Sequence, residues 1–119
     1  MRRPVNKGDQ MKTLNQYIKL AGETSGTTNS QESKNASNAI GRAIKKAFPN
    51  YKVTHSVGHF YCTGFVRNGE KVVYYSFSDY RFFGDSGIIR YARDEKDYTG
   101  QENISVNSGN IVSKIGGLL

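Results

Sequence analysis

Two histidines and a cysteine lie within eight residues of one another, and these are the side chains with the clearest chemical potential. His55, His59 and Cys62 could hold zinc or form a Cys/His nucleophile. In an extended strand the two histidines would be about 13 Å apart, at roughly 3.3 Å per residue, too far for one metal ion. A hairpin turning at Gly58-His59 would instead place His55 opposite Cys62, on the apolar face. We favour a buried thiol beside a hydrogen-bonded imidazole.

A set of acidic residues in the second half of the chain could include the metal ligands of a nuclease. They are Asp79, Asp85, Asp94, Glu95 and Asp97. The spacing Asp94-x-Lys96 is similar to a short metal-dependent cleavage motif. Surface pairing with neighbouring arginines and lysines explains the same residues without a metal. We therefore expect a non-enzymatic protein with no cofactor and no metal, and a small metal-dependent nuclease is the alternative.

The net positive charge is concentrated in the first half of the chain. Residues 1–60 contain ten Lys/Arg against three Asp/Glu, hence +7, whereas residues 61–119 contain seven of each. Such a bias favours an anionic partner, nucleic acid above all, although a solvated outer face is the plainer interpretation. The candidate phosphate-binding or partner-binding residues are Lys34, Arg42, Lys45, Lys46, Lys52 and Arg67.

Two helices are predicted before any strand. Residues 12–21 carry apolar side chains at helical spacing, with Thr13 as a cap and Gly22 as the end. Residues 35–48 form a second helix with an alanine and isoleucine stripe, closed by Pro49, and its opposite side carries the basic cluster. Residues 23–34 are predicted to be a flexible loop, and residues 1–10 a disordered basic arm or a cloning remnant.

Two turn signals then predict an antiparallel meander. With Asn68-Gly69 as a two-residue turn, Arg67 faces Glu70 and Phe65 faces Val72. Combined with the turn at Gly58-His59, this register defines a core face. Its members are Tyr51, Val53, His55, Val57, Phe60, Cys62, Gly64, Val66, Val73, Tyr75 and Phe77. Residues 88–92 are a candidate fourth strand, and the carboxy-terminal segment is predicted to cap the domain because Gly116-Gly117 weakens a helix there.

The other sheet face is polar except for an aromatic patch. The candidate aromatic platform consists of Tyr61, Phe65 and Tyr74. Either another segment buries these rings, or they stay open to stack on bases or to dock a partner protein. The sequence alone leaves both possibilities open.

Taken together, these patterns predict an α+β fold. Two amino-terminal helices precede an antiparallel sheet of three or four strands, in one domain over residues 11–119, either monomeric or homodimeric.

A single cysteine gives no support for secretion, and no run of about 18–20 apolar residues could span a bilayer. We expect a cytoplasmic protein.

Two segments resemble proteins of mobile genetic elements. The helix that runs into Ala47-Phe48-Pro49-Asn50-Tyr51-Lys52-Val53 looks like small accessory domains of phages and conjugative elements. The run Arg90-Tyr91-Ala92-Arg93-Asp94-Glu95-Lys96-Asp97-Tyr98-Thr99-Gly100-Gln101-Glu102-Asn103 is similar to mobile-element proteins of gut bacteria. The family that the chain resembles is the anti-CRISPR inhibitors of Cas9-type nucleases. This resemblance implies a stoichiometric inhibitor that binds the nuclease or its guide-loaded complex, with no catalytic residues. A charge of +7 argues against DNA mimicry and for contact with RNA or DNA.

Overall fold

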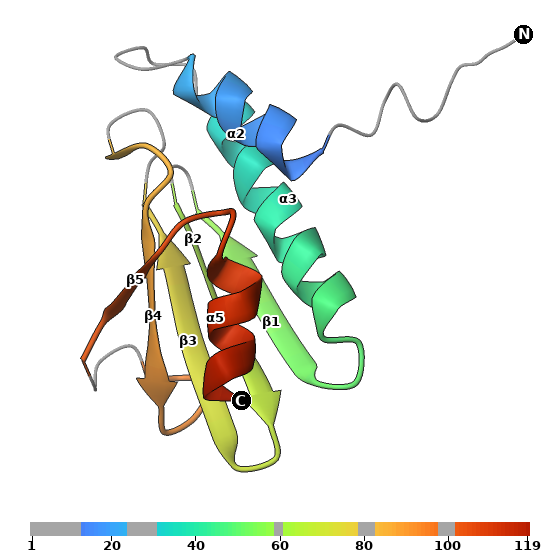
Figure 1. Ribbon diagram of the computed structural model, residues 1–119, viewed down its shortest axis with the longest axis vertical. Helices are drawn as coiled ribbons and strands as arrows, with labels where there is room; N and C mark the ends of the chain where they lie inside the picture. The colour runs from blue at the N-terminus through green and yellow to red at the C-terminus, as the bar shows by residue number, and fades with distance from the viewer. Residues whose placement is uncertain (1–12, 24–30, 59–60, 79–82, 98–101) are drawn as a thin grey trace, which may run out of the picture.

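The computed structural model describes residues 13–23, 31–58, 61–78, 83–97 and 102–119. Its centre is a five-stranded antiparallel sheet with the strands in chain order (Figure 1). The strands are β1 (Lys52–Val57), β2 (Cys62–Asn68), β3 (Lys71–Phe77), β4 (Gly87–Ala92) and β5 (Ile104–Val106), and the helices are α2 (Leu14–Gly22), α3 (Gln31–Ala47) and α5 (Ile111–Leu118). The α+β class is confirmed. The sheet has one strand more than predicted, because the tail at Ile104–Val106 pairs with β4.

The core lies on one face of the sheet, where α3 and α5 pack side by side (Figure 1). Ile40 and Ile44 of α3 and Ile111 and Ile115 of α5 are fully buried against the strands. The helix α2 packs along α3 and buries Ala21. The predicted packing of the second helix over the apolar strand face is therefore confirmed.

The helix starts follow local signals at α2 but not at α3. Thr13 caps α2 as predicted: its hydroxyl accepts from the Gln16 N–H at 3.2 Å, and the Gln16 side chain accepts from the Thr13 N–H at 2.8 Å. The helix α3 begins at Gln31, four residues before the predicted start, so residues 31–34 are helical and not a flexible loop. The polar composition of residues 31–34 led to the wrong prediction of a loop. Ser33 is polar, but it is fully buried and small enough to pack.

Both hairpin registers differ from the prediction by two residues. Val57 pairs with Cys62 and His55 with Gly64, while Arg67 pairs with Val72. The second turn consists of Gly69-Glu70, with Gly69 at a φ of 64°. Because side chains alternate with a period of two, a shift of two residues leaves every side chain on its predicted face.

The carboxy-terminal segment caps the domain as a regular helix, in spite of its two glycines. Burying an isoleucine is worth roughly 1.5–3 kcal/mol, and α5 buries Ile111 and Ile115. A glycine within a helix costs about 1 kcal/mol, and Gly116 and Gly117 lie in the last turn. Burial therefore outweighs the weak helix propensity.

Several predicted features lie outside the described residues. They are the arm at residues 1–10, most of the loop at 23–34, and the side chains of His59, Phe60 and Asp79. Within the described parts of the chain, every helix is too short or too polar to cross a membrane.

Candidate functional site

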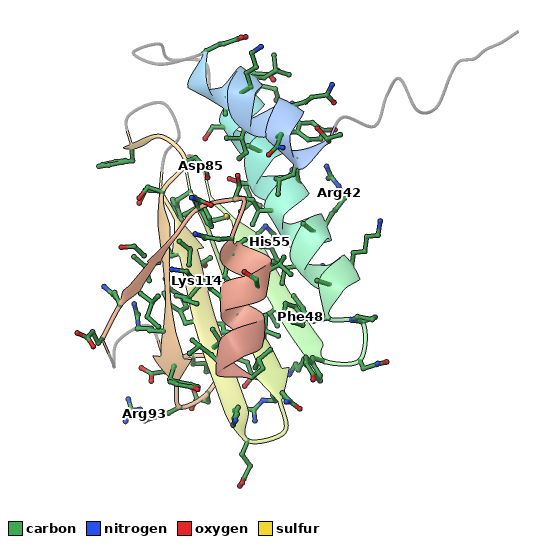
Figure 2. All side chains as sticks on the ribbon, viewed as in Figure 1. Arg42, Phe48, His55, Asp85, Arg93 and Lys114 are labelled. Carbon is green, nitrogen blue, oxygen red and sulfur yellow. The ribbon has the colours of Figure 1, made fainter. Side chains whose placement is uncertain are left out.

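The outer side of α3 carries an exposed basic surface. Arg42, Lys45 and Lys46 are three and four positions apart, so they share one side of the helix, while Ile40 and Ile44 are buried on the other. We call these three cations the α3 basic face. Figure 2 shows Arg42 on the side of α3 that points away from the sheet, and its guanidinium lies 5.5 Å from the centre of the Tyr17 ring. Within the described residues, none of the three cations has an acidic partner.

Between α3 and β1 the surface forms a basic hollow of about 390 Å³ next to this face. Its lining residues are Asn38, Gly41, Arg42, Lys45, His55 and Val57. Two cations and an amide therefore surround a space that an anionic group could enter. Oxyanions such as phosphate suit this set of donors.

The His55 side chain forms the floor of the basic hollow, and its position depends on Gly41. A side chain at Gly41 would overlap the imidazole, so only glycine lets β1 and α3 approach this closely. The two ring nitrogens bond in opposite directions, to the Ser37 carbonyl oxygen at 2.9 Å and to the Tyr75 hydroxyl at 2.6 Å. Burial lowers the pKa of His55, and the nearby Lys45 lowers it further. The imidazole is therefore neutral, donates from Nε2 to Ser37 and accepts from Tyr75 at Nδ1.

Strand β1 forms one edge of the sheet, and half of its backbone groups face outward. The Gly58 N–H donates to the Tyr61 carbonyl at 2.8 Å, and the hydrogen-bonded pairs of an antiparallel ladder alternate. By this alternation the N–H groups of Val53, His55 and Val57 point away from β2. His55 and Val57 also line the basic hollow, so this hollow lies next to the outer edge of β1.

Two of the predicted phosphate-binding residues are engaged elsewhere. Arg67 donates to the Glu95 carboxylate at 2.6 Å, and Lys52 lies 3.0 Å from the same carboxylate. Bonds from Arg67 first and Lys52 second lower the pKa of Glu95 to about 2. Both cations extend from the sheet face opposite to α3, as their positions in the strands predict, so they do not form part of the α3 basic face. Lys34 is half-buried in the first turns of α3, about two turns from Arg42, and does not line the basic hollow.

The candidate aromatic platform is mostly buried, which is the first of the two possibilities that the sequence left open. Phe65 and Tyr74 are only 3% and 7% exposed, with ring centres 5.2 Å apart. The Arg90 guanidinium lies 4.3 Å above the Tyr74 ring and covers it. Of the three platform residues, only Tyr61 is accessible, at 54% exposure.

The candidate catalytic residues have structural roles. Cys62 is fully buried and faces Val57, not His55, so the predicted Cys/His pair is not formed. Burial raises the pKa of the Cys62 thiol to about 11, which disfavours the nucleophilic thiolate. Both nitrogens of His55 are already bonded.

The predicted acidic residues are dispersed. Asp85 accepts from the backbone and hydroxyl of Ser108, Asp94 accepts from the Lys96 N–H, and Asp97 pairs with Arg93. Over the ranges that the structure describes, no three His, Cys, Asp or Glu side chains are grouped to hold a metal ion. These acidic residues stabilise loops and turns.

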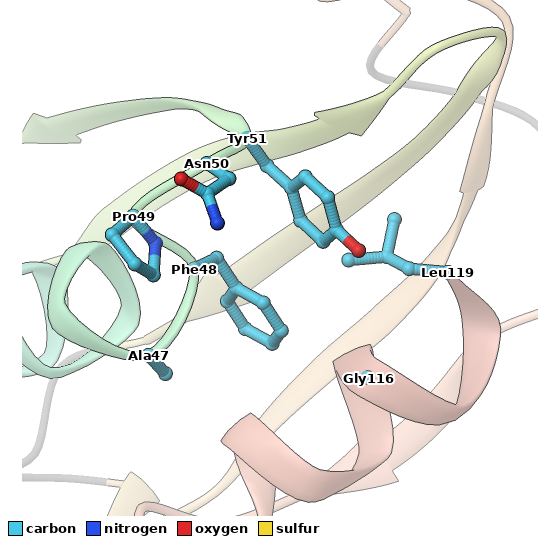
Figure 3. A pocket seen from close by; sticks show the side chains of 7 residues that line it. All are labelled: Ala47, Phe48, Pro49, Asn50, Tyr51, Gly116 and Leu119. Carbon is cyan, nitrogen blue, oxygen red and sulfur yellow. The ribbon is translucent and has the colours of Figure 1, made fainter.

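A separate apolar hollow of about 310 Å³ lies between the end of α3 and α5 (Figure 3). The stacked rings of Phe48 and Tyr51, 5.9 Å apart, form one wall, and Gly116 and Leu119 form the other. No charged side chain lines it among the described residues. It therefore offers mainly apolar contact, with the Asn50 amide and the Tyr51 hydroxyl as polar groups and no lysine or arginine in its described lining to attract phosphate.

Sequence reasoning missed Asn38, Gly41 and Val57 as lining residues of the basic hollow. Nothing local marks them, because their role follows from the packing of α3 against β1. Comparison of the chain with protein-family models found no matching family, and searches of curated proteins and of solved structures found no match either.

Proposed function

We propose that the protein is a non-enzymatic binding protein that contacts nucleic-acid phosphates through the α3 basic face. One observation carries this proposal: three cations are exposed together, without acidic partners among the described residues, beside a hollow lined by hydrogen-bond donors. A cation that already pairs with a carboxylate gains little free energy by binding phosphate. A cation without such a partner releases counterions from the nucleic acid when it binds phosphate, and this release favours binding.

The resemblance to anti-CRISPR proteins suggests a more specific target. On this proposal the protein acts in the bacterial cytoplasm and inhibits a Cas9-type nuclease by binding RNA or DNA exposed on its guide-loaded complex. The charge of +7 supports contact with nucleic acid over imitation of it. A general nucleic-acid-binding accessory protein of a mobile element is the second candidate, and the same basic surface supports it.

Charge reversal on α3 tests the phosphate contact. The double variant Lys45→Glu/Lys46→Glu should weaken binding to short RNA and DNA in a fluorescence anisotropy assay. It should also reduce the slope of log affinity against log salt by about two, since each phosphate contact contributes roughly 0.9 to that slope. Lys96→Glu is a control, because Lys96 is equally exposed but lies in the loop after β4. Equal effects of the two changes, or no binding by the unmodified protein, would refute the phosphate contact.

A cleavage assay separates the two targets. Guide-loaded Cas9-type nuclease is mixed with a molar excess of the protein before target DNA is added. Suppressed cleavage that is restored by Lys45→Glu/Lys46→Glu supports the inhibitor. Normal cleavage together with salt-dependent binding to free nucleic acid supports the general accessory protein.

A further inference from the structure

A second hollow lies at the end of β1, next to the basic hollow. It has a volume of about 430 Å³, and its lining residues are Ser56, Val57, Gly58, Tyr61 and Thr63. We call it the tyrosine hollow. The Tyr61 ring lies directly over Gly58, where any side chain would overlap it, and the backbone of Gly58 bonds to that of Tyr61. An aromatic ring is thus held at the edge of the sheet and is 54% exposed.

Val57 lines both hollows, so they lie on either side of the same stretch of the β1 edge. On one side of Val57 are the cations Arg42 and Lys45, and on the other is the Tyr61 ring. The outward N–H of Val57 lies between them. Charge, a backbone donor and an aromatic surface are therefore arranged along one edge of the protein.

We infer that this edge binds single-stranded nucleic acid, with an unpaired base stacked on Tyr61 and the adjoining phosphates on Arg42 and Lys45. The inference depends on the proposed function and narrows its ligand. A single strand offers both groups together: phosphates for the cations and a free base for the ring. In a duplex the bases are paired and stacked, so only the phosphates could be bound.

The other aromatic residues considered above do not offer this combination. Phe65 and Tyr74 are buried, and the ring of Tyr51 belongs to the apolar hollow, whose described lining has no charged side chain. Tyr51 is still 37% exposed and is a tyrosine on the same protein, which makes Tyr51→Ala a matched control for Tyr61→Ala.

Oligonucleotides with and without bases test the inference directly. The probes are a labelled 12-nucleotide single-stranded DNA, the same strand with abasic sites that keep every phosphate, the matching duplex, and a single-stranded RNA of the same sequence. Anisotropy titrations compare the unmodified protein with Tyr61→Ala, Tyr61→Phe, Tyr51→Ala and Lys45→Glu. Circular dichroism melting confirms that each variant is folded.

We expect the single strand to bind about 5-fold to 100-fold more tightly than the abasic strand, the range spanned by stacking of one base on an aromatic ring. Tyr61→Ala should remove this difference without changing binding to the abasic strand, while Tyr61→Phe and Tyr51→Ala should retain it. The DNA and RNA arms show which sugar is preferred, and a preference for either supports the inference.

The possible failures are distinguishable. If Lys45→Glu weakens binding but Tyr61→Ala does not, base stacking is refuted and the proposed phosphate contact stands. If the abasic strand or the duplex binds as tightly as the single strand, selection of single strands is refuted and the proposed phosphate contact stands. If no probe binds, the proposed function and this inference are both refuted.

Discussion

Replacing Gly64 by alanine should strongly destabilise the protein, because the space above this glycine is already occupied. Gly64 lies in the middle of β2, between His55 of β1 and Tyr75 of β3. The Tyr75 phenol crosses over Gly64 so that its hydroxyl reaches His55 Nδ1 at 2.6 Å. A methyl group at Gly64 would overlap the end of the Tyr75 ring and the Thr54 carbonyl oxygen. The carbonyl belongs to a paired strand, so it cannot simply move aside.

The size of the effect follows from three contributions. Overpacking a filled core costs about 1–3 kcal/mol. If Tyr75 moves away, His55 keeps a buried acceptor without a partner, at a cost of about 1–3 kcal/mol. Alanine lowers the conformational entropy of the unfolded chain, and this offsets about 0.4–1 kcal/mol of the cost. We therefore expect the free energy of unfolding to fall by about 1–5 kcal/mol, and the melting temperature by about 4–20 °C.

Urea unfolding followed by circular dichroism measures this change, and Gly117→Ala is the matched control. A side chain at Gly117 would meet no atom within 4 Å, and the residue lies in the last turn of α5. That substitution should leave the stability unchanged or raise it by up to about 1 kcal/mol. If Gly64→Ala were as stable as the parent protein, the close packing of Tyr75 over β2 would be wrong.

Three further predictions concern buried polar groups. Because the pKa of His55 is lowered below its ordinary 6.5, its stabilising effect is complete above that pH and declines as the pH falls through the lower folded value. The melting temperature should therefore drop as the pH falls below about 6.5, less so in His55→Gln, and a flat profile would contradict this. Cys62, with a pKa of about 11, should react with a disulfide reagent only after unfolding, and rapid labelling of the native protein would show that it is accessible. The buried Ser33 hydroxyl has no partner among the described residues, so Ser33→Ala should be neutral or stabilising by up to about 1 kcal/mol in the same urea assay, and a clear loss would reveal a hidden partner.

The sheet faces could be predicted from the sequence even though both registers were wrong. Alternation of side chains is a local property, and an error of two residues preserves it, so Val66, Val73 and Tyr75 are all in the core as expected. The turn positions are less certain, because Asn68-Gly69 and Gly69-Glu70 both supply a glycine for the left-handed position. Only the pairing of the full strands distinguishes these alternatives.

The candidate site was only partly predictable, because exposure depends on contacts between distant residues. The α3 basic face follows from helical spacing alone. The pairing of Lys52 and Arg67 depends on Glu95, which is 28 residues away from Arg67 in the chain. Burial of Tyr74 likewise depends on Arg90 of the neighbouring strand. No local pattern contains this information.

The positive charge is distributed unevenly along the chain, and it is also distributed unevenly over the folded protein. In the described part of the second half, arginines pair with nearby acids: Arg67 with Glu95 and Arg93 with Asp97. Glu95 also pairs with Lys52, and no ion pair joins a described carboxylate to the α3 basic face. Lys45 and Lys46 therefore keep their charge toward solvent, on the helix beside the open edge of β1. The exposed cations of the α3 basic face therefore make this edge of the described protein electropositive, and such a surface attracts anions.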